Sequence, residues 1–215
     1  TQSRSSAASD VYKRQGPEEK QLGFDTVSKI KAYAALASAS RNTENELYIT
    51  EVNWPLQEMS RWSPSAEYLI EESLQSSYLI RYYLLMLASG KVKKCYWHQL
   101  VAPGYGLVNN LDGEIKKRDA YFCFKHLISI LSNGKIKKFI QEKKLYSLIV
   151  EKEHTIIEAV WSSDGNATFK SQPCQQIFDI RGNAIETKNS STIEITGEVI
   201  SVSYTHLRAH ETEAD

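Results

Sequence analysis

The sequence predicts an α/β domain followed by a small antiparallel β module, and two observations carry this prediction. From residue 26 to residue 131, segments of helical and of strand character alternate, as is typical of parallel strands joined by crossover helices. After Gly134, short β segments follow one another, separated by turn signals at residues 164–166 (Asp-Gly-Asn) and 181–183 (Arg-Gly-Asn). The domain boundary is expected near residues 132–138.

The α/β part is expected to begin with a helix, a strand and a second helix. Asp25-Thr26 can cap the first helix, which would end before a polar loop at residues 41–45. A buried-type strand follows at Leu47–Thr50, and residues 53–65 are loop-like. The second helix should span residues 66–89 and end at Gly90. Helical spacing predicts two apolar faces: Val27, Ile30, Tyr33, Ala34 and Leu36 in the first helix, and Leu74, Tyr78, Leu79, Tyr82, Leu85 and Met86 in the second.

A second strand is expected at residues 92–99, followed by a loop and a third helix at residues 117–131. The core face of this third helix would comprise Ala120, Phe124, Leu127 and Ile128. The β module should hold about five or six strands in a sandwich-like arrangement. Its expected strands are residues 145–152, 155–162, 167–170, 176–180 and 191–201.

The composition is that of an ordinary soluble globular protein and favours no polyanionic partner. The chain has 215 residues, 41% hydrophobic and 24% charged, with a formal net charge of zero. We therefore expect neither nucleic-acid binding nor attraction to an anionic membrane. The longest apolar run, residues 78–88, is interrupted by Arg81 and is too short to span a bilayer.

No metal or cofactor site is expected. Cys95, Cys123 and Cys174 lie far apart and are odd in number, so no disulfide framework or paired-cysteine metal site is expected. His126 and His154 have no second ligand at metal spacing and are read as structural or solvated. The Pro-Gly-Tyr-Gly turn at residues 103–106 lacks the spacing of a phosphate-binding loop.

Both ends of the chain differ from its middle. Residues 1–15 and 202–215 show no apolar periodicity, and they resemble translated read-through of sequencing adaptors. Disordered termini are the simpler alternative. On either interpretation the expected organisation is a tail at 1–15, an α/β domain at 16–132, a β module at 133–201 and a tail at 202–215.

Polar, ionisable and aromatic side chains lie at the ends of both predicted strands. Glu51 ends the first strand, with Asn53 and Trp54 directly after it, and the second strand ends in Trp97, His98 and Gln99. In α/β barrels, the chemistry takes place at the carboxyl ends of the strands. Sugars have apolar faces and polar rims, so carboxylates beside aromatic platforms suit a carbohydrate. The alternatives are a solvated strand-end Glu, a core Trp and a structural His.

Four motifs together resemble the C-terminal part of clan A glycoside hydrolases, narrowly the β-xylosidase and α-iduronidase type. They are ITEVNWP, YYLLMLASGKVKK, CYWHQLVAPGYGLVN and KKRDAYFCFKHL, within residues 20–132. The resemblance implies the last two strands of a (β/α)8 TIM barrel, and a small β-sandwich often follows such barrels. Residues 47–51 would be the seventh strand, with Glu51 as catalytic nucleophile. Residues 93–99 would be the eighth, with Trp97 as the aromatic floor where the bond is cleaved.

The same resemblance implies a retaining enzyme with a second carboxylate. That acid/base comes from an Asn-Glu pair after the fourth strand, and no pair in this chain can replace it, since Asn45-Glu46 precedes the seventh strand. We therefore expect the 215-residue chain to be an inactive fragment of an intact glycosidase that acts on a polysaccharide or a glycolipid glycan. One alternative is a non-catalytic carbohydrate-binding relative with Trp54, Trp62 and Trp97 as platforms. Another is an unrelated α/β domain joined to an adhesion-type sandwich.

Overall fold

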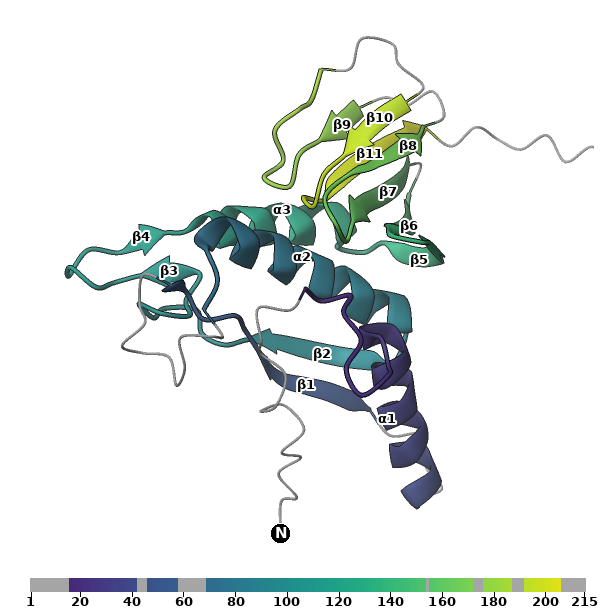
Figure 1. Ribbon diagram of the computed structural model, residues 1–215, viewed down its shortest axis with the longest axis horizontal. Coiled ribbons are helices and arrows are strands. Elements are labelled where there is room, and N and C mark those ends of the chain that lie inside the picture. Colours follow the sequence, from purple (N-terminus) through teal and green to yellow (C-terminus); the bar gives the residue numbers. More distant parts are fainter. Residues whose placement is uncertain are drawn as a thin grey trace, which may run out of the picture. The chain divides into compact units, whose positions relative to one another are not determined.

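The structure, a computed structural model, describes residues 16–41, 46–57, 69–153, 155–171, 176–186 and 192–205 (Figure 1). The chain divides into two compact units: Thr1–Leu127, called unit 1, and Ile128–Asp215, called unit 2. Trp62, His154, Cys174 and most of both expected tails lie outside the described residues. Each unit has its own strands and is described by itself.

Unit 1 confirms the expected alternation of helix and strand. Its main elements are α1 (Thr26–Arg41), β1 (Leu47–Val52), α2 (Glu72–Ser89), β2 (Val92–Trp97) and the start of α3 (Asp119–Leu131). Strands β1 and β2 pair in parallel, with Leu47 opposite Val92 and Val52 opposite Trp97. The two strands run side by side in the same direction in Figure 1. Parallel strands bring their carboxyl ends to one edge, which is where the candidate residues are.

Helix α2 is shorter at its start than the sequence predicts. It begins at Glu72 instead of residue 66, because Ile70 is still extended and pairs with the chain that follows β1. The Ile70 N–H donates to Pro55 O at 3.0 Å, and the Gln57 N–H donates to Ile70 O at 2.9 Å. The predicted end is confirmed: Gly90 has φ of 62°, and its N–H bonds Leu87 O.

Helix α2 buries charge as well as apolar surface. Arg81, which interrupts the apolar run, forms an ion pair with Glu18, and both side chains are about 95% buried. Its Nε donates to Glu18 Oε1 at 2.8 Å, and its Nη2 bonds Oε2. The expected apolar face is therefore only partly right, since Leu74 is 41% exposed while Gln75 is fully buried. The ion pair fixes the segment before α1 onto α2.

The expected faces of the other two helices also need correction. Ala120 and Leu127 of α3 are buried as predicted, but Ile128 is 53% exposed and Cys123 takes a core position. Helix α3 starts at Asp119, not at residue 117, because Lys116–Lys117 form the short strand β4 with β3 (Val108–Asn109). In α1, Val27 and Ile30 are buried, whereas Tyr33 and Leu36 are exposed.

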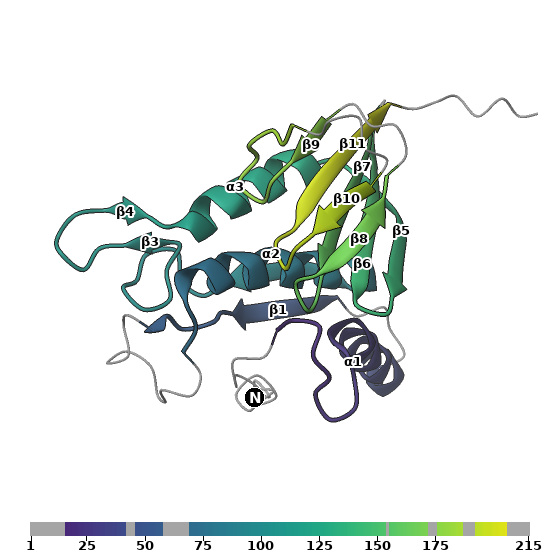
Figure 2. The ribbon, with the colours of Figure 1, turned by 45° about the horizontal axis from the view of Figure 1, so that its top comes forward.

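Unit 2 is built from two antiparallel sheets, in agreement with the predicted sandwich-like module. The larger sheet has the order β5-β6-β7-β11-β9, and the smaller sheet pairs β10 with β8. Figure 2 shows β8 and β10 lying in front of the larger sheet. The strands of unit 2 are β5 (Lys135–Glu142), β6 (Leu145–Lys152), β7 (Thr155–Ser162), β8 (Ala167–Lys170), β9 (Gln176–Phe178), β10 (Thr192–Ile195) and β11 (Ile200–Thr205).

Three expectations for unit 2 differ from the structure. The structure has a strand that was not expected from the sequence, β5, which begins within residues 132–138 and pairs with β6. The expected strand at 191–201 is two strands, since β10 pairs with β8 while β11 pairs with β7 and β9. Strand β11 also continues to Thr205, so residues 202–205 belong to the sheet and not to a tail. The ends of these strands are set by pairing with strands that are distant in sequence, and the local residue pattern does not reveal such pairing.

The core of unit 2 lies between its two sheets. Six buried residues form one cluster: Val160, Ile177, Ile193, Ile195, Ile200 and Val202. On β6 and β7, Tyr146 stacks on Trp161 with ring centroids 5.4 Å apart. Leu148 of β6 is fully buried. Alternate residues of β10 are buried, as in a strand with one covered face. In β6, three successive residues, 146–148, are buried.

We predict that Leu148→Ala destabilises unit 2 by about 2–5 kcal/mol, because it removes a fully buried side chain and leaves a cavity. Urea unfolding followed by fluorescence measures this change. The matched control is Leu36→Ala on α1, which is 67% exposed and should alter stability by no more than about 0.5 kcal/mol. Equal effects of the two substitutions would contradict the burial of Leu148.

Candidate functional site

The carboxyl ends of β1 and β2 lie together, as the sequence predicts. Val52 is opposite Trp97, and the His98 N–H donates to Val52 O at 3.0 Å. The next peptide bond, between His98 and Gln99, is cis. The parallel register of the two strands makes Glu51 and His98, which are 47 positions apart in sequence, neighbours at one edge of the strand pair.

Glu51 and His98 form the exposed, ionisable part of this site. His98 Nδ1 lies 3.8 Å from Glu51 Oε2, and the two side chains are 43% and 59% exposed, respectively. Gln99 is also exposed. A carboxylate with this exposure is open to attack a ligand, and the imidazole beside it can donate a hydrogen bond. Because the pair is solvated, its electrostatic contribution to stability is small.

Trp54 and Trp97 stack behind the exposed pair. Their ring centroids are 6.3 Å apart, at an interplanar angle of 29°. Trp97 is partly exposed, whereas Trp54 is 5% exposed and meets Tyr78 and Tyr82 of α2 edge to face. The Gln75 side chain donates to Trp54 O at 2.9 Å. Trp54 thus supports Trp97 from beneath, and only Trp97 offers part of its ring to a ligand.

The backbone carbonyl of Tyr105 also links the two strand ends. Asn53 Nδ2 donates to Tyr105 O at 2.8 Å, and Trp97 Nε1 donates to the same oxygen at 3.2 Å. A carbonyl oxygen has two lone pairs, so both bonds can form together. Asn53 is 7% exposed, and its Oδ1 has no hydrogen-bond partner among the described residues. Asn53 thus fixes the site from inside and offers a ligand little surface.

The loop that carries Tyr105 is closely packed against itself. A Cβ on Gly106 would lie 2.4 Å from Ala102 N and 2.6 Å from Val108 O, so only glycine fits there. The Tyr105 ring meets His98 edge to face, with centroids 5.9 Å apart. From the sequence we expected only a turn at residues 103–106 and missed Tyr105. The functional group of Tyr105 is a main-chain carbonyl, and residue type does not reveal the partners of such a group.

The other reactive groups of unit 1 do not favour a different chemistry. Burial raises the pKa of the Cys95 thiol to about 11, so this thiol stays protonated and a weak nucleophile at neutral pH. The described residues contain no cluster of three or more His, Cys, Asp or Glu side chains suited to a metal ion. Within the same residues, no helix has both the length and the hydropathy needed to cross a membrane. At this edge of the strand pair, Glu51 carries an exposed carboxylate.

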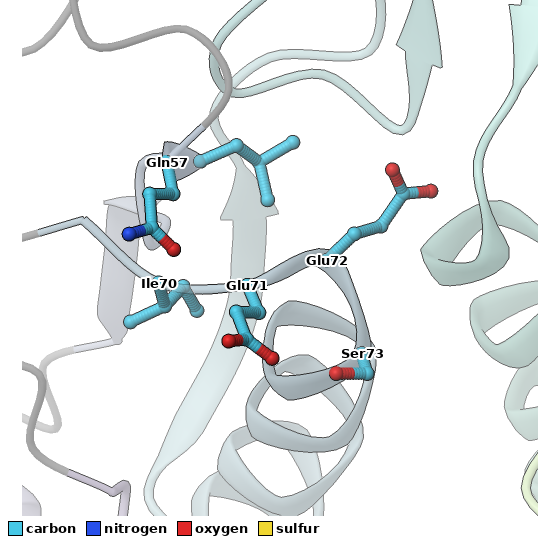
Figure 3. Close-up of a pocket in the computed structure, with 6 residues that line it drawn as sticks. Gln57, Ile70, Glu71, Glu72 and Ser73 are labelled. Carbon is cyan, nitrogen blue, oxygen red and sulfur yellow. The ribbon is translucent and has the colours of Figure 1, made fainter.

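A cavity of about 440 Å³ lies beside the loop that follows β1 (Figure 3). Figure 3 shows the Glu71 and Glu72 carboxylates turned to different sides at the start of α2. The Leu56 N–H donates to Gly104 O at 3.0 Å, which connects the cavity wall with the Tyr105 loop. Neither Glu51 nor Trp97 lines this cavity, so it is distinct from the strand-end cluster. Its lining residues are Leu56, Gln57, Ile70, Glu71, Glu72 and Ser73.

Solved structures similar to this chain include glycoside hydrolases. A family 39 glycoside hydrolase from the gut symbiont Bacteroides cellulosilyticus has a TM-score of 0.72 and 13% identity, over 90% of this chain and 43% of that chain. A family 30 endoxylanase from Clostridium papyrosolvens has a TM-score of 0.50 and 9% identity, over 82% and 46%. A conserved exported protein from Bacteroides fragilis has a TM-score of 0.56 and 11% identity, over 83% and 42%.

These likenesses define the class of fold. The mixed helix-and-sheet fold of this chain is similar to that of glycoside hydrolases, at identities that show the fold alone. The chain spans less than half the length of each of these three structures. No model of a known protein family matches the sequence, and no curated protein matches it.

We predict that Asn53→Asp destabilises unit 1 by roughly 2–3 kcal/mol at pH 7, because a buried carboxylate would face the Tyr105 carbonyl oxygen. The folded state should raise the pKa of the new carboxyl above its unfolded value of about 3.9. The protonated form can donate to Tyr105 O. The loss in free energy of unfolding, relative to wild type, should therefore be small below pH 4. It should grow as pH rises through the pKa of the new carboxyl in the folded state.

Urea unfolding at several pH values, compared with wild type, measures this difference. Asn110→Asp, at an exposed position in the β3–β4 connection, is the matched control and should show no pH-dependent deficit. An Asn53→Asp protein with wild-type stability at pH 7 would contradict the buried hydrogen bond.

Proposed function

We propose that this chain belongs to a retaining glycoside hydrolase in which Glu51 is the nucleophile. The observation that carries the proposal is the strand-end cluster: an exposed carboxylate at the end of β1 beside His98, with the half-exposed Trp97 on the neighbouring strand. The likeness of the fold to glycoside hydrolases supports it. On this proposal β1 and β2 correspond to the seventh and eighth strands of a TIM barrel.

In the proposed reaction, Glu51 attacks the anomeric carbon of a sugar whose ring lies against Trp97. The C–O bond to the leaving group breaks as the Glu51 ester forms, and a carboxylic acid gives its proton to the departing oxygen. The same group, now a carboxylate, then takes a proton from water, which displaces Glu51 and releases the sugar with its original configuration. His98 and Gln99, both exposed, are placed to bond sugar hydroxyls.

The mechanism needs a second carboxyl about 5–5.5 Å from Glu51. The Asn-Glu pair that the family resemblance implies has no counterpart among these 215 residues. We infer that the acid/base is supplied by residues outside them, and that the chain as given does not hydrolyse glycosides by itself.

A second candidate function is carbohydrate binding without hydrolysis. The stacked pair of Trp54 and Trp97 favours it, because Trp54 rigidly supports an indole that needs no carboxylate to bind a sugar face. Under this alternative Glu51 is a solvated side chain that bonds a hydroxyl.

Glu51→Gln in the intact gene product separates the two functions. Gln has the same shape but cannot form the ester, so under the first proposal hydrolysis of aryl glycosides falls by orders of magnitude while binding persists. Isothermal titration with soluble xylan tests binding, chosen because one similar structure is an endoxylanase. The matched control is Glu114→Gln, whose side chain is 74% exposed in the β3–β4 connection.

A further variant, Glu51→Gly, tests the nucleophile itself. Removal of the side chain leaves room for azide, which should restore turnover and give a glycosyl azide of opposite anomeric configuration. Full activity of Glu51→Gln would exclude Glu51 as nucleophile. A wild-type protein that binds glycans and hydrolyses none would favour the binding alternative.

A further inference from the structure

Arg118 is a buried cation next to the loop that carries Tyr105. Its side chain is 5% exposed and lies between the start of α2 and the loop. Nη1 bonds Glu72 Oε2 at 2.7 Å, and Nη2 donates to Pro103 O at 2.7 Å. Its Nε has no hydrogen-bond partner among the described residues.

The backbone of Arg118 holds the other side of the same loop. Its N–H donates to Leu107 O at 3.0 Å, while its guanidinium holds Pro103 O, two residues before Tyr105. Between these points, Gly104 O accepts from Leu56 N, and Tyr105 O accepts from Asn53 and Trp97. Arg118 therefore contacts the loop on both sides of Tyr105, whose carbonyl accepts from residues at both strand ends.

Burying a guanidinium costs free energy, so the groups that contact Arg118 indicate its role. Removing an ion from water costs several kcal/mol unless partners compensate it. Glu72 compensates the charge and also accepts from Asp119 N at 3.3 Å, which ties the start of α3 to the start of α2. A neutral side chain would fill the space at lower cost, but it would leave Pro103 O without this donor. The geometry thus favours a role in holding the loop.

We propose that Arg118 is a positioning residue for the carbohydrate site. It holds the loop of residues 103–107 so that the Tyr105 carbonyl keeps Trp97 and Asn53 in the orientation that receives a sugar ring. This inference rests on the proposed function for its ligand, and on the contacts of Arg118 for its mechanism. Arg118 itself touches no sugar.

Hydrogen–deuterium exchange of the 215-residue chain tests the mechanism without a sugar. The reporters are the amides of Leu56, Gly106 and Val108, which donate to Gly104, Ala102 and Leu100. In Arg118→Met, loss of charge-assisted bonds should speed exchange in this loop about tenfold or more. Strands β6 and β7 of unit 2 should exchange as in wild type. Arg118→Lys keeps the charge without the planar fork and should give an intermediate rate.

Arg181→Met, at an exposed turn of unit 2, is the matched control for the substitution and should leave the loop unchanged. Unchanged loop exchange in Arg118→Met would overturn the proposal. Uniformly faster exchange throughout unit 1 would also overturn it, because that result indicates general stability and not positioning. If Arg118→Met does not fold, Arg118→Lys gives the decision on the same amides.

Titration of the intact gene product with soluble xylan adds a functional readout. Where wild type binds, Arg118→Met should weaken binding at least about tenfold, and Arg118→Lys less, because Trp97 loses its fixed orientation. Undiminished binding by Arg118→Met would contradict the positioning role. If wild type does not bind xylan, this sugar is excluded as the ligand, and the exchange experiment decides whether Arg118 orders the loop.

Discussion

The site depends on an acceptor shared by both strand ends, the carbonyl oxygen of Tyr105. Asn53, after β1, and Trp97, at the end of β2, both donate to it, so the two strand ends are joined by a group that belongs to neither. Only a fixed loop can hold that oxygen in place, and the close approach at Gly106 together with Arg118 provides this. The orientation of the Trp97 ring follows from these bonds.

Helix α2 connects this arrangement to the rest of unit 1 through two ion pairs. Glu72, at its first turn, holds Arg118, and Arg81, further along, holds Glu18. Between them, Gln75 bonds the Trp54 carbonyl, and Tyr78 and Tyr82 meet the Trp54 ring. The helix therefore presents to the strand-end cluster a face that is polar as well as aromatic. Each of these buried arginines is paired with a carboxylate, which offsets the cost of removing its charge from water.

Residue pattern was sufficient for the order of α1, β1, α2, β2 and α3 and for the meeting of the two strand ends. Glu51, Trp97 and His98 were found because strand periodicity ends just before or at them, and parallel strands bring such ends together. The pattern failed where long-range pairing decides, as in β5, the division of residues 191–201, and the start of α2. Tyr105 and Arg118 were missed for a related reason. The amino-acid type of a residue does not reveal which groups its backbone carbonyl accepts from. An Arg is expected at the surface unless its buried partners are known.

The main-chain groups of residues 103–107 are largely hydrogen-bonded, and this affects how the site could be engineered. A loop whose main-chain groups are occupied, and in which residue 106 admits no side chain, is a poor place for combinatorial variation. The neighbouring residues Gln99, Leu100 and Val101 are exposed, so their side chains point to solvent and not into this loop. On the proposed function, a library that seeks a new glycan preference should randomise those three positions and leave residues 103–107 unchanged, so that the position of the Trp97 ring is kept.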